Sequence, residues 1–355
     1  MIPADLSRCV VRAVRCAVED GELPAEGVVT QRVVVERTRP GGVGDYATPV
    51  AFQVAKSAGR PPRDVADVLA RRLRAEPGIE QVEVTGAGFL NFVLPAPCAA
   101  SLVREAIVWD IVIRDVRGGA AFLTGADHRA AAGLGLRERV VGESVLRIVR
   151  AVHGTGVSTG APVASGARAR ARTDVRAGAV DREGDVAPAA PVAPLAPRDA
   201  DVLARYGADA AAWAMLTAPA RETPVFSDVL LTQGESSEFF RVRYAHARSH
   251  ALTRNAALLG FAAEPGDVDA PELLRALADQ SLVLEAAAHH RAPERLARHL
   301  VELADALLDF QHRVLPQGDE KPSAAHRARL ALAEAAGTVL AGGLALLGID
   351  APTRL

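Results

Sequence analysis

Residues 238–254 read EFFRVRYAHARSHALTR, a stretch without glycine or proline that predicts one long helix. Helical spacing sorts its side chains into an apolar stripe and a basic stripe. The apolar stripe holds Phe240, Tyr244, Ala247 and Ala251, and the basic stripe holds Arg243, His246, His250 and Arg254. The first stripe can pack in a helical bundle, and the second can meet an anionic partner. A core-facing side with solvated charge opposite explains the same pattern without any binding function.

The residues after this stretch predict further helices at 271–288, 293–315 and 323–347. Leucines recur at helical spacing along the first two of them, at positions 273, 277, 284, 296, 300, 303 and 307. Amphipathic helices joined by short connections are typical of an antiparallel bundle. We therefore expect an all-α helical bundle over residues 199–355.

The composition limits what kind of partner the chain can bind. A 49% hydrophobic content suffices for packed cores, and 355 residues leave room for two or three domains. The formal net charge of -2 gives no global basic field, so a nucleic-acid site must be a local patch. Cys9, Cys16 and Cys98 are too few and too badly spaced for a disulfide framework or a zinc site. We expect no metal and no cofactor.

The N-terminus and the hydropathy pattern predict a cytoplasmic protein. Residues 1–21 contain six charged side chains, which is unlike a signal peptide. We find no run of about 18 apolar residues and therefore expect no membrane span.

Several landmarks around the opening stretch occur in a familiar order. YAHAR at 244–248 follows DVLARYGADAAAWAML at 201–216, and LPQGDE at 315–320 precedes LALLGIDAPTRL at 344–355. Together they resemble the DALR anticodon-binding domain of arginyl-tRNA synthetase. The resemblance implies tRNA contacts from Arg243, Tyr244, His246 and Arg248. Tyr244 also lies on the apolar stripe, so a core position for it remains an alternative.

The first 100 residues predict a small α+β domain. Helices are expected at 3–18, 50–58 and 62–74, a strand at 27–37, and a hairpin over 79–94 with its turn at 86–88. A Gly-rich loop at 40–49 runs into a helix start, a place where phosphate can bind. The loop lacks the Lys-Ser/Thr pair of a P-loop.

Short motifs in this domain resemble the extra N-terminal domain of arginyl-tRNA synthetase. They include GDYAT at 44–48 and GFLNF at 88–92. The resemblance implies contact with the D-loop of tRNA, with Phe89 stacking on an unpaired base and Asn91 reading a base edge. The alternative is that Phe89 belongs to the strand core and Asn91 is a surface residue near the turn.

Between the two ends lies too little chain for the family's catalytic domain. Residues 101–153 predict a degenerate αβ remnant of a nucleotide-binding domain, with a strand-like run at 107–113 and a helix at 136–152. Residues Ala132 to Gly135 occupy the register of the family's HIGH motif and contain no histidine. The two lysines, Lys56 and Lys321, lie far from any position of a KMSKS-type loop. Residues 154–198, rich in Ala, Pro, Gly and Arg, predict a disordered linker. We expect no catalytic residues.

The sequence thus leads to three hypotheses about function. The first is a non-catalytic tRNA-binding relative of arginyl-tRNA synthetase that recognises arginine tRNA through its D-loop and anticodon ends. The second is arginine–tRNA ligase activity with ATP, which requires another chain to supply the catalytic domain. The third is a repurposed interaction scaffold that binds a synthetase or another protein.

Overall fold

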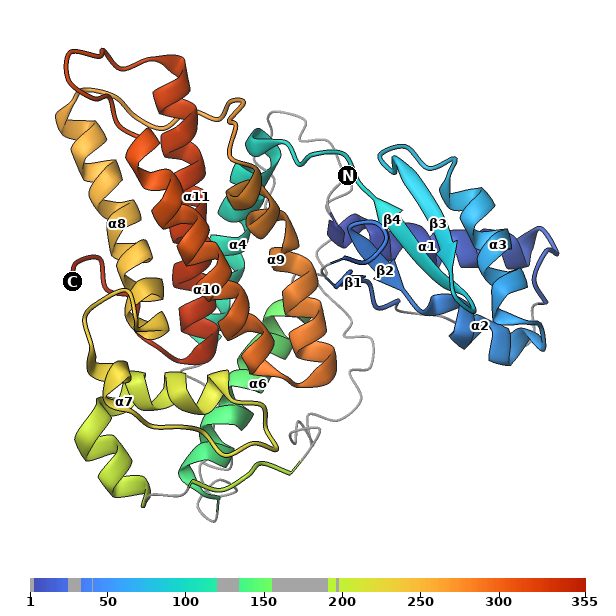
Figure 1. Ribbon diagram of the computed structural model, residues 1–355, viewed down its shortest axis with the longest axis horizontal. Helices are drawn as coiled ribbons and strands as arrows, with labels where there is room; N and C mark the ends of the chain where they lie inside the picture. The colour runs from blue at the N-terminus through green and yellow to red at the C-terminus, as the bar shows by residue number, and fades with distance from the viewer. Residues whose placement is uncertain (1–2, 25–32, 40, 120–133, 155–190, 196–197) are drawn as a thin grey trace, which may run out of the picture.

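The computed structural model describes residues 3–24, 33–39, 41–119, 134–154, 191–195 and 198–355. These residues form a small α+β domain and a helical bundle (Figure 1), which confirms the predicted fold class. Most of the predicted linker at 154–198 lies outside the described residues. So do strand residues 27–32 and HIGH-register positions 132 and 133.

The N-terminal domain packs three helices against one antiparallel sheet of order β1-β2-β4-β3. Its elements are α1 (Pro3–Glu19), β1 (Glu36–Arg37), β2 (Tyr46–Thr48), α2 (Val50–Ala58), α3 (Pro62–Leu73), β3 (Gln81–Thr85) and β4 (Phe89–Val93). The three helices and the β3–β4 hairpin match the prediction. Leu90 and Phe92 alternate along β4 with Phe89 and Asn91, and the first pair is buried in the core that α1 and α3 complete.

The predicted loop at 40–49 was too long, because β2 occupies its last part. Tyr46 pairs with Phe92 of β4, and Thr48 donates a hydrogen bond from Oγ1 to the Val34 carbonyl oxygen at 2.7 Å. Tyr46 and Thr48 are both buried, whereas Ala47 between them is not. The glycines before these residues hid the alternating pattern of a short strand.

The remaining described helices form one bundle. They are α4 (Ala99–Gly119), α6 (Leu136–Gly154), α7 (Asp199–Thr217), α8 (Glu238–Leu258), α9 (Pro271–His290), α10 (Pro293–Phe310) and α11 (Ala324–Leu347), with 3₁₀ turns η3 (Asp228–Leu231) and η4 (Gln311–Arg313). The helices expected at 136–152, 238–259, 271–288 and 323–347 are confirmed. The one expected at 293–315 is confirmed to Phe310 and continues as η4.

The strand predicted at 107–113 is wrong, because these residues lie inside helix α4. The buried positions Leu102, Ala106, Trp109 and Ile113 recur every three or four residues, which is the helical period. Ile107 and Ile111 between them are exposed and made the run look continuously apolar. The β-branched composition favours a strand, but packing against α11 stabilises the helix instead.

The predicted remnant at 101–153 has no core of its own in the described residues. Side chains of α4 and α6 belong to the same hydrophobic cluster as those of α8 to α11. Ser144 Oγ and Arg147 Nε also donate to the carbonyl oxygen of Leu346, at 3.2 and 2.9 Å. These bonds attach α6 to the end of α11, so both helices are part of the bundle.

Helix α11 lies at the centre of the bundle (Figure 1). Two of its glycines allow close contacts, because a Cβ at Gly342 would lie 2.4 Å from Trp109 Nε1 and one at Gly343 would lie 2.4 Å from Leu300 Cδ2. Among the described helices, α11 alone is long and apolar enough to cross a membrane. Since 78% of its most apolar window is buried inside the bundle, it has the environment of a core helix.

Candidate nucleic-acid interface

Helix α8 buries a face that overlaps only in part with the predicted apolar stripe. It begins after Ser237, whose Oγ accepts a hydrogen bond from the Phe240 N–H at 3.3 Å. Its core contacts come from Phe239, Val242, Ala245, Leu252 and Ala256. Of the predicted apolar stripe, Ala247 is buried, Phe240 and Ala251 are half-buried and Tyr244 is exposed, so the prediction is wrong at Tyr244. Two sets of apolar residues recur at helical spacing along this helix, and the set with Val242 and Leu252 faces the core.

Two aromatic residues at the edge of this core, half-buried Phe240 and exposed Tyr244, form a stacked pair. The rings of Phe240 and Tyr244 stack with centroids 5.4 Å apart and an interplanar angle of 12°, and Tyr244 is 38% exposed. An exposed, flat aromatic surface is costly to hydrate and is suited to stacking on an unpaired base. Tyr244 therefore has the surface position and not the alternative core position.

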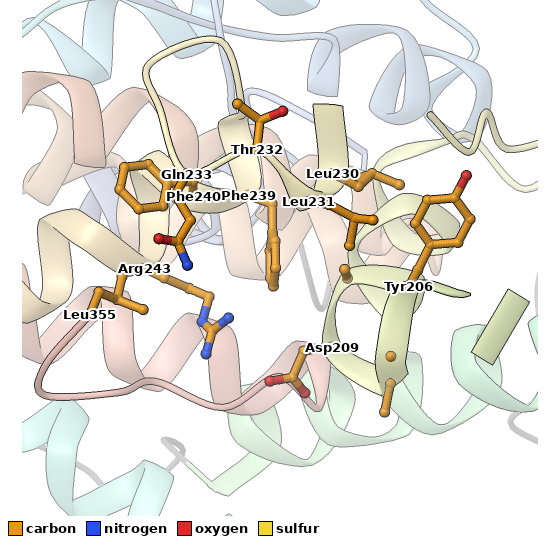
Figure 2. A pocket seen from close by; sticks show the side chains of 13 residues that line it. Tyr206, Asp209, Leu230, Leu231, Thr232, Gln233, Phe239, Phe240, Arg243 and Leu355 are labelled. Carbon is orange, nitrogen blue, oxygen red and sulfur yellow. The ribbon is translucent and has the colours of Figure 1, made fainter. Parts of the chain in front are cut away.

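A pocket of about 490 Å³ opens beside this pair, with Phe240 in its wall. It lies between the α7 kink, the η3 segment and α8, and the last residue of the chain, Leu355, also lines it. Figure 2 shows the side chains of Arg243 and Asp209 pointing toward one another across the pocket, with Phe239 above and between them in this view. Its volume is within the range of small-ligand sites, and its walls combine aromatic rings with charged groups.

Arg243 is the cation of this pocket. Its guanidinium carbon lies 5.1 Å from the ring centroid of Phe239, which is a cation–π contact. Its Nε is buried and has no hydrogen-bond partner among the described residues. A buried donor without a partner favours a ligand that supplies an acceptor.

The kink in α7 shapes the other wall of the pocket. Gly207 has φ 74° and ψ 170°, so the helix is interrupted between Tyr206 and Asp209, which both line the pocket. A residue with a Cβ would be strained at this positive φ. Tyr206, Asp209 and Gln233 were not predicted as site residues. The isolated Gly207 in a helical pattern was the signal of a break within residues 201–216.

His246 and Arg248, the other predicted contacts on α8, are engaged within the protein. His246 is only 3% exposed, and its Nδ1 lies 2.9 Å from the carbonyl oxygen of Pro352. The prediction of an exposed basic stripe is therefore wrong at this residue, which positions the C-terminal tail instead. Arg248 is half-buried and donates from Nε to Gln311 Oε1 at 2.5 Å. His250 and Arg254 of the same stripe are exposed.

In the N-terminal domain, Phe89 and Asn91 lie on the face of β4 opposite the buried Leu90 and Phe92. Phe89 is 44% exposed and meets Phe52 edge to face, with centroids 5.0 Å apart. Asn91 is 6% exposed and donates from Nδ2 to Thr85 Oγ1 at 2.7 Å. Phe89 is thus placed for stacking, whereas Asn91 is held in the sheet and has one of its two amide protons engaged.

Two observations concern metal binding and the HIGH-register positions. In the described ranges, no group of three or more His, Cys, Asp and Glu side chains is arranged to hold a metal ion. The described HIGH-register positions, Leu134 and Gly135, directly precede α6, and the Gly135 N–H is bonded to Glu138 Oε2 at 3.0 Å. This backbone group therefore serves the start of the helix.

Comparison with known proteins identifies both ends of the chain. Residues 6–94 match the family described as the arginyl tRNA synthetase N terminal domain, and residues 242–355 match the DALR anticodon binding domain. The chain is 28% identical to the arginine–tRNA ligase of Frankia alni in an alignment covering 100% of both. That alignment spans 555 residues and this chain has 355, so at least 200 aligned positions hold no residue of this chain.

A solved structure matches over the whole length as well. The arginyl-tRNA synthetase of Thermus thermophilus aligns with a TM-score of 0.54 and 15% identity, covering 100% of both chains. At this identity the match concerns the fold.

Proposed function

Since the chain is an arginyl-tRNA synthetase-like protein with that family's N-terminal and DALR anticodon-binding domains, we propose that it binds arginine tRNA without aminoacylating it. The observation that carries the proposal is the stacked pair of half-buried Phe240 and exposed Tyr244 beside the Arg243 pocket. It provides the groups that an unstacked base needs: aromatic faces, a guanidinium and nearby hydrogen-bonding side chains.

The α8 surface is proposed as the anticodon end. Single-stranded loops expose bases that can be splayed out, stacked on aromatic rings and read at their edges. Phe240 and Tyr244 offer the stacking surface, and Arg243 lies in a pocket large enough for one base. His246 acts indirectly, by holding the tail that brings Leu355 to the pocket.

The β4 face is proposed as the D-loop end. Phe89 offers an exposed ring at the hairpin, next to Gly88, where a Cβ would lie 2.9 Å from the Pro62 carbonyl oxygen. This crowding and the φ of 142° at Gly88 fix the backbone that presents Phe89. Asn91 lies two residues further along the same face, but it is 6% exposed and bonded to Thr85, so in this proposal it supports the hairpin while Phe89 makes the direct contact.

The lack of catalysis is inferred from the residues that the chain has in place of the family's motifs. Ala132 to Gly135 carry no side-chain donors for ATP phosphates, and neither Lys56 nor Lys321 stands at the position of a lysine loop. Only 147 residues, 95–241, separate the two family matches, and a nucleotide-binding domain with its insertions would require more chain than the part of them outside the bundle provides.

A protein partner is the second candidate, and one observation favours it. Ile107, Val108 and Ile111 form an exposed aliphatic stripe on α4, a surface that is typical of protein–protein contact. A synthetase bound there would also be the route to ligase activity with ATP, because it would supply the catalytic domain. Co-elution of the purified protein with an arginyl-tRNA synthetase, lost on Ile111→Asp, would support this candidate.

Two assays on the purified full chain test the main proposal. Nuclease footprinting should show protection of both the D-loop and the anticodon loop of arginine tRNA. Incubation with arginine, ATP and the same tRNA should yield no arginyl-tRNA. Protection of neither loop would refute tRNA recognition, whereas charging of the tRNA by the purified chain would refute only the non-catalytic part.

A further inference from the structure

A buried polar junction joins the N-terminal domain to helix α9 of the bundle. The Tyr46 hydroxyl donates to Asp279 Oδ1 at 2.5 Å, and Arg37 Nη1 donates to Asp279 Oδ2 at 2.9 Å. Tyr46 and Asp279 are 5% and 6% exposed. Both oxygens of one carboxylate on α9 therefore bind side chains of the other domain.

Apolar and charged contacts surround this carboxylate. Leu282, three residues further along α9, packs into the core of the N-terminal domain. At the outer edge, Glu36 Oε1 accepts from Arg295 Nη1 at 3.0 Å and lies 3.5 Å from His290 Nε2. The junction thus has the arrangement of a specific protein interface, with a buried centre and a charged rim.

The buried carboxylate of Asp279 requires one particular orientation of the N-terminal domain against α9. Burial raises the pKa of the Asp279 carboxyl, while the hydrogen bond from Tyr46 and the charge of Arg37 act in the opposite direction. A buried carboxylate is tolerated only when its oxygens are paired, so Tyr46 and Arg37 must both be in position. Tyr46 lies in β2, directly opposite Phe92 of β4. The same contact therefore sets the position of the β4 face relative to α9.

We propose that the Asp279 junction holds the two domains as one rigid body, so that a single tRNA molecule contacts the β4 face and the α8 face at once. The β4 sheet and α8 lie toward opposite ends of the long axis, with α9 between them (Figure 1). Fixing two binding faces at a set spacing makes the second contact intramolecular. The joint RNA contact rests on the proposed function; the rigid docking does not.

Small-angle X-ray scattering of the full chain without RNA tests the docking. Asp279→Ala should increase the maximum dimension, whereas Arg275→Ala, an exposed neighbour on α9, should leave it unchanged. A charge exchange at the rim separates docking from folding: Arg295→Glu should loosen the pair, and Glu36→Arg with Arg295→Glu should restore it. Identical scattering curves for wild type, Asp279→Ala and Arg295→Glu would overturn the rigid junction.

Titrations with two RNAs test the joint contact. Wild type should bind intact arginine tRNA about 100-fold more tightly than its isolated anticodon stem-loop. Asp279→Ala should lose this advantage and bind the stem-loop as wild type does. If wild type binds both RNAs equally, the joint contact is refuted while tRNA binding stands. If wild type binds neither RNA, the proposed function and the joint contact both fail, and scattering alone decides the docking.

Discussion

The rings of Phe240 and Tyr244 lie 5.4 Å apart and within 12° of parallel on the surface of α8. Stacking of a base on an aromatic ring contributes about 1–3 kcal/mol. We therefore expect Tyr244→Ala to weaken binding of the anticodon stem-loop by roughly 5- to 100-fold, and Tyr244→Phe to retain most of the affinity, since the ring stays. Leu258→Ala, on the same helix and highly exposed, is the matched control. If all variants bind the stem-loop with equal affinity, Phe240 and Tyr244 are not part of the RNA interface.

The guanidinium of Arg137 is held by four backbone carbonyls. Nη1 donates to Ala193 and Glu222, and Nη2 donates to Ala218 and Pro219, at 2.5–3.1 Å. Lysine is a point charge and cannot match this fork, so Arg137→Lys leaves some of these four carbonyls without their donor. We expect a loss of about 3 kcal/mol in the free energy of unfolding, measured by urea denaturation. Arg139→Lys, on the exposed side of α6, should change it by less than about 0.5 kcal/mol.

Two glycines should respond to alanine with opposite signs. At Gly343 of α11, a Cβ would lie 2.4 Å from Leu300 Cδ2, so Gly343→Ala overpacks the core and should cost about 1–3 kcal/mol. At Gly142 of α6, nothing lies within 4 Å of the added Cβ. Gly142→Ala should therefore stabilise the helix by about 0.5–1 kcal/mol. Thermal melts of both variants check the pair, and a loss of stability at Gly142 would contradict the packing described for α6.

His299 of α10 should make stability fall in mild acid. Burial, and to a smaller extent the charge of Arg37, lower its pKa to about 4, below the value near 6.5 of an unfolded chain. Between these values the unfolded chain binds a proton that the native state does not, so stability is lost as the pH falls from about 6.5 toward 4.

A variant without the imidazole isolates this effect from that of the buried carboxyls. The free energy of unfolding of wild type, relative to His299→Leu, should drop by on the order of 2 kcal/mol between pH 7.5 and pH 5. The raised pKa of Asp279 acts with the opposite sign but is common to both proteins. A difference that does not change with pH would contradict a neutral, buried His299.

Much of the fold could be predicted because the signals are local. The β3–β4 hairpin and the ends of α8, α9 and α11 follow from turn glycines, helix-start prolines and apolar spacing. The strand expected at 107–113 failed because Ile107 and Ile111 are apolar yet exposed, and only packing against α11 shows which side of α4 is buried.

Only part of the candidate site could be predicted, because the buried side of α8 is also set by packing. Motif resemblance found Arg243 and Tyr244, but one helix can carry two stripes of similar spacing, and the sequence alone does not choose between them. Tyr244 was therefore placed on the apolar stripe and His246 on the basic one, whereas Tyr244 is exposed and His246 is buried. The pocket residues Tyr206 and Asp209 depend on the kink at Gly207, a long-range arrangement without a local motif.

The most direct test of the account is a titration of the full chain with arginine tRNA and with an unrelated tRNA at two salt concentrations. We expect arginine tRNA to bind more tightly than the unrelated tRNA at both salt concentrations. The affinity of each tRNA should fall as salt rises, because phosphate contacts contribute to the binding of each. Equal and weak binding of the two RNAs would contradict specific tRNA recognition and leave the exposed stripe of α4 as the remaining functional surface.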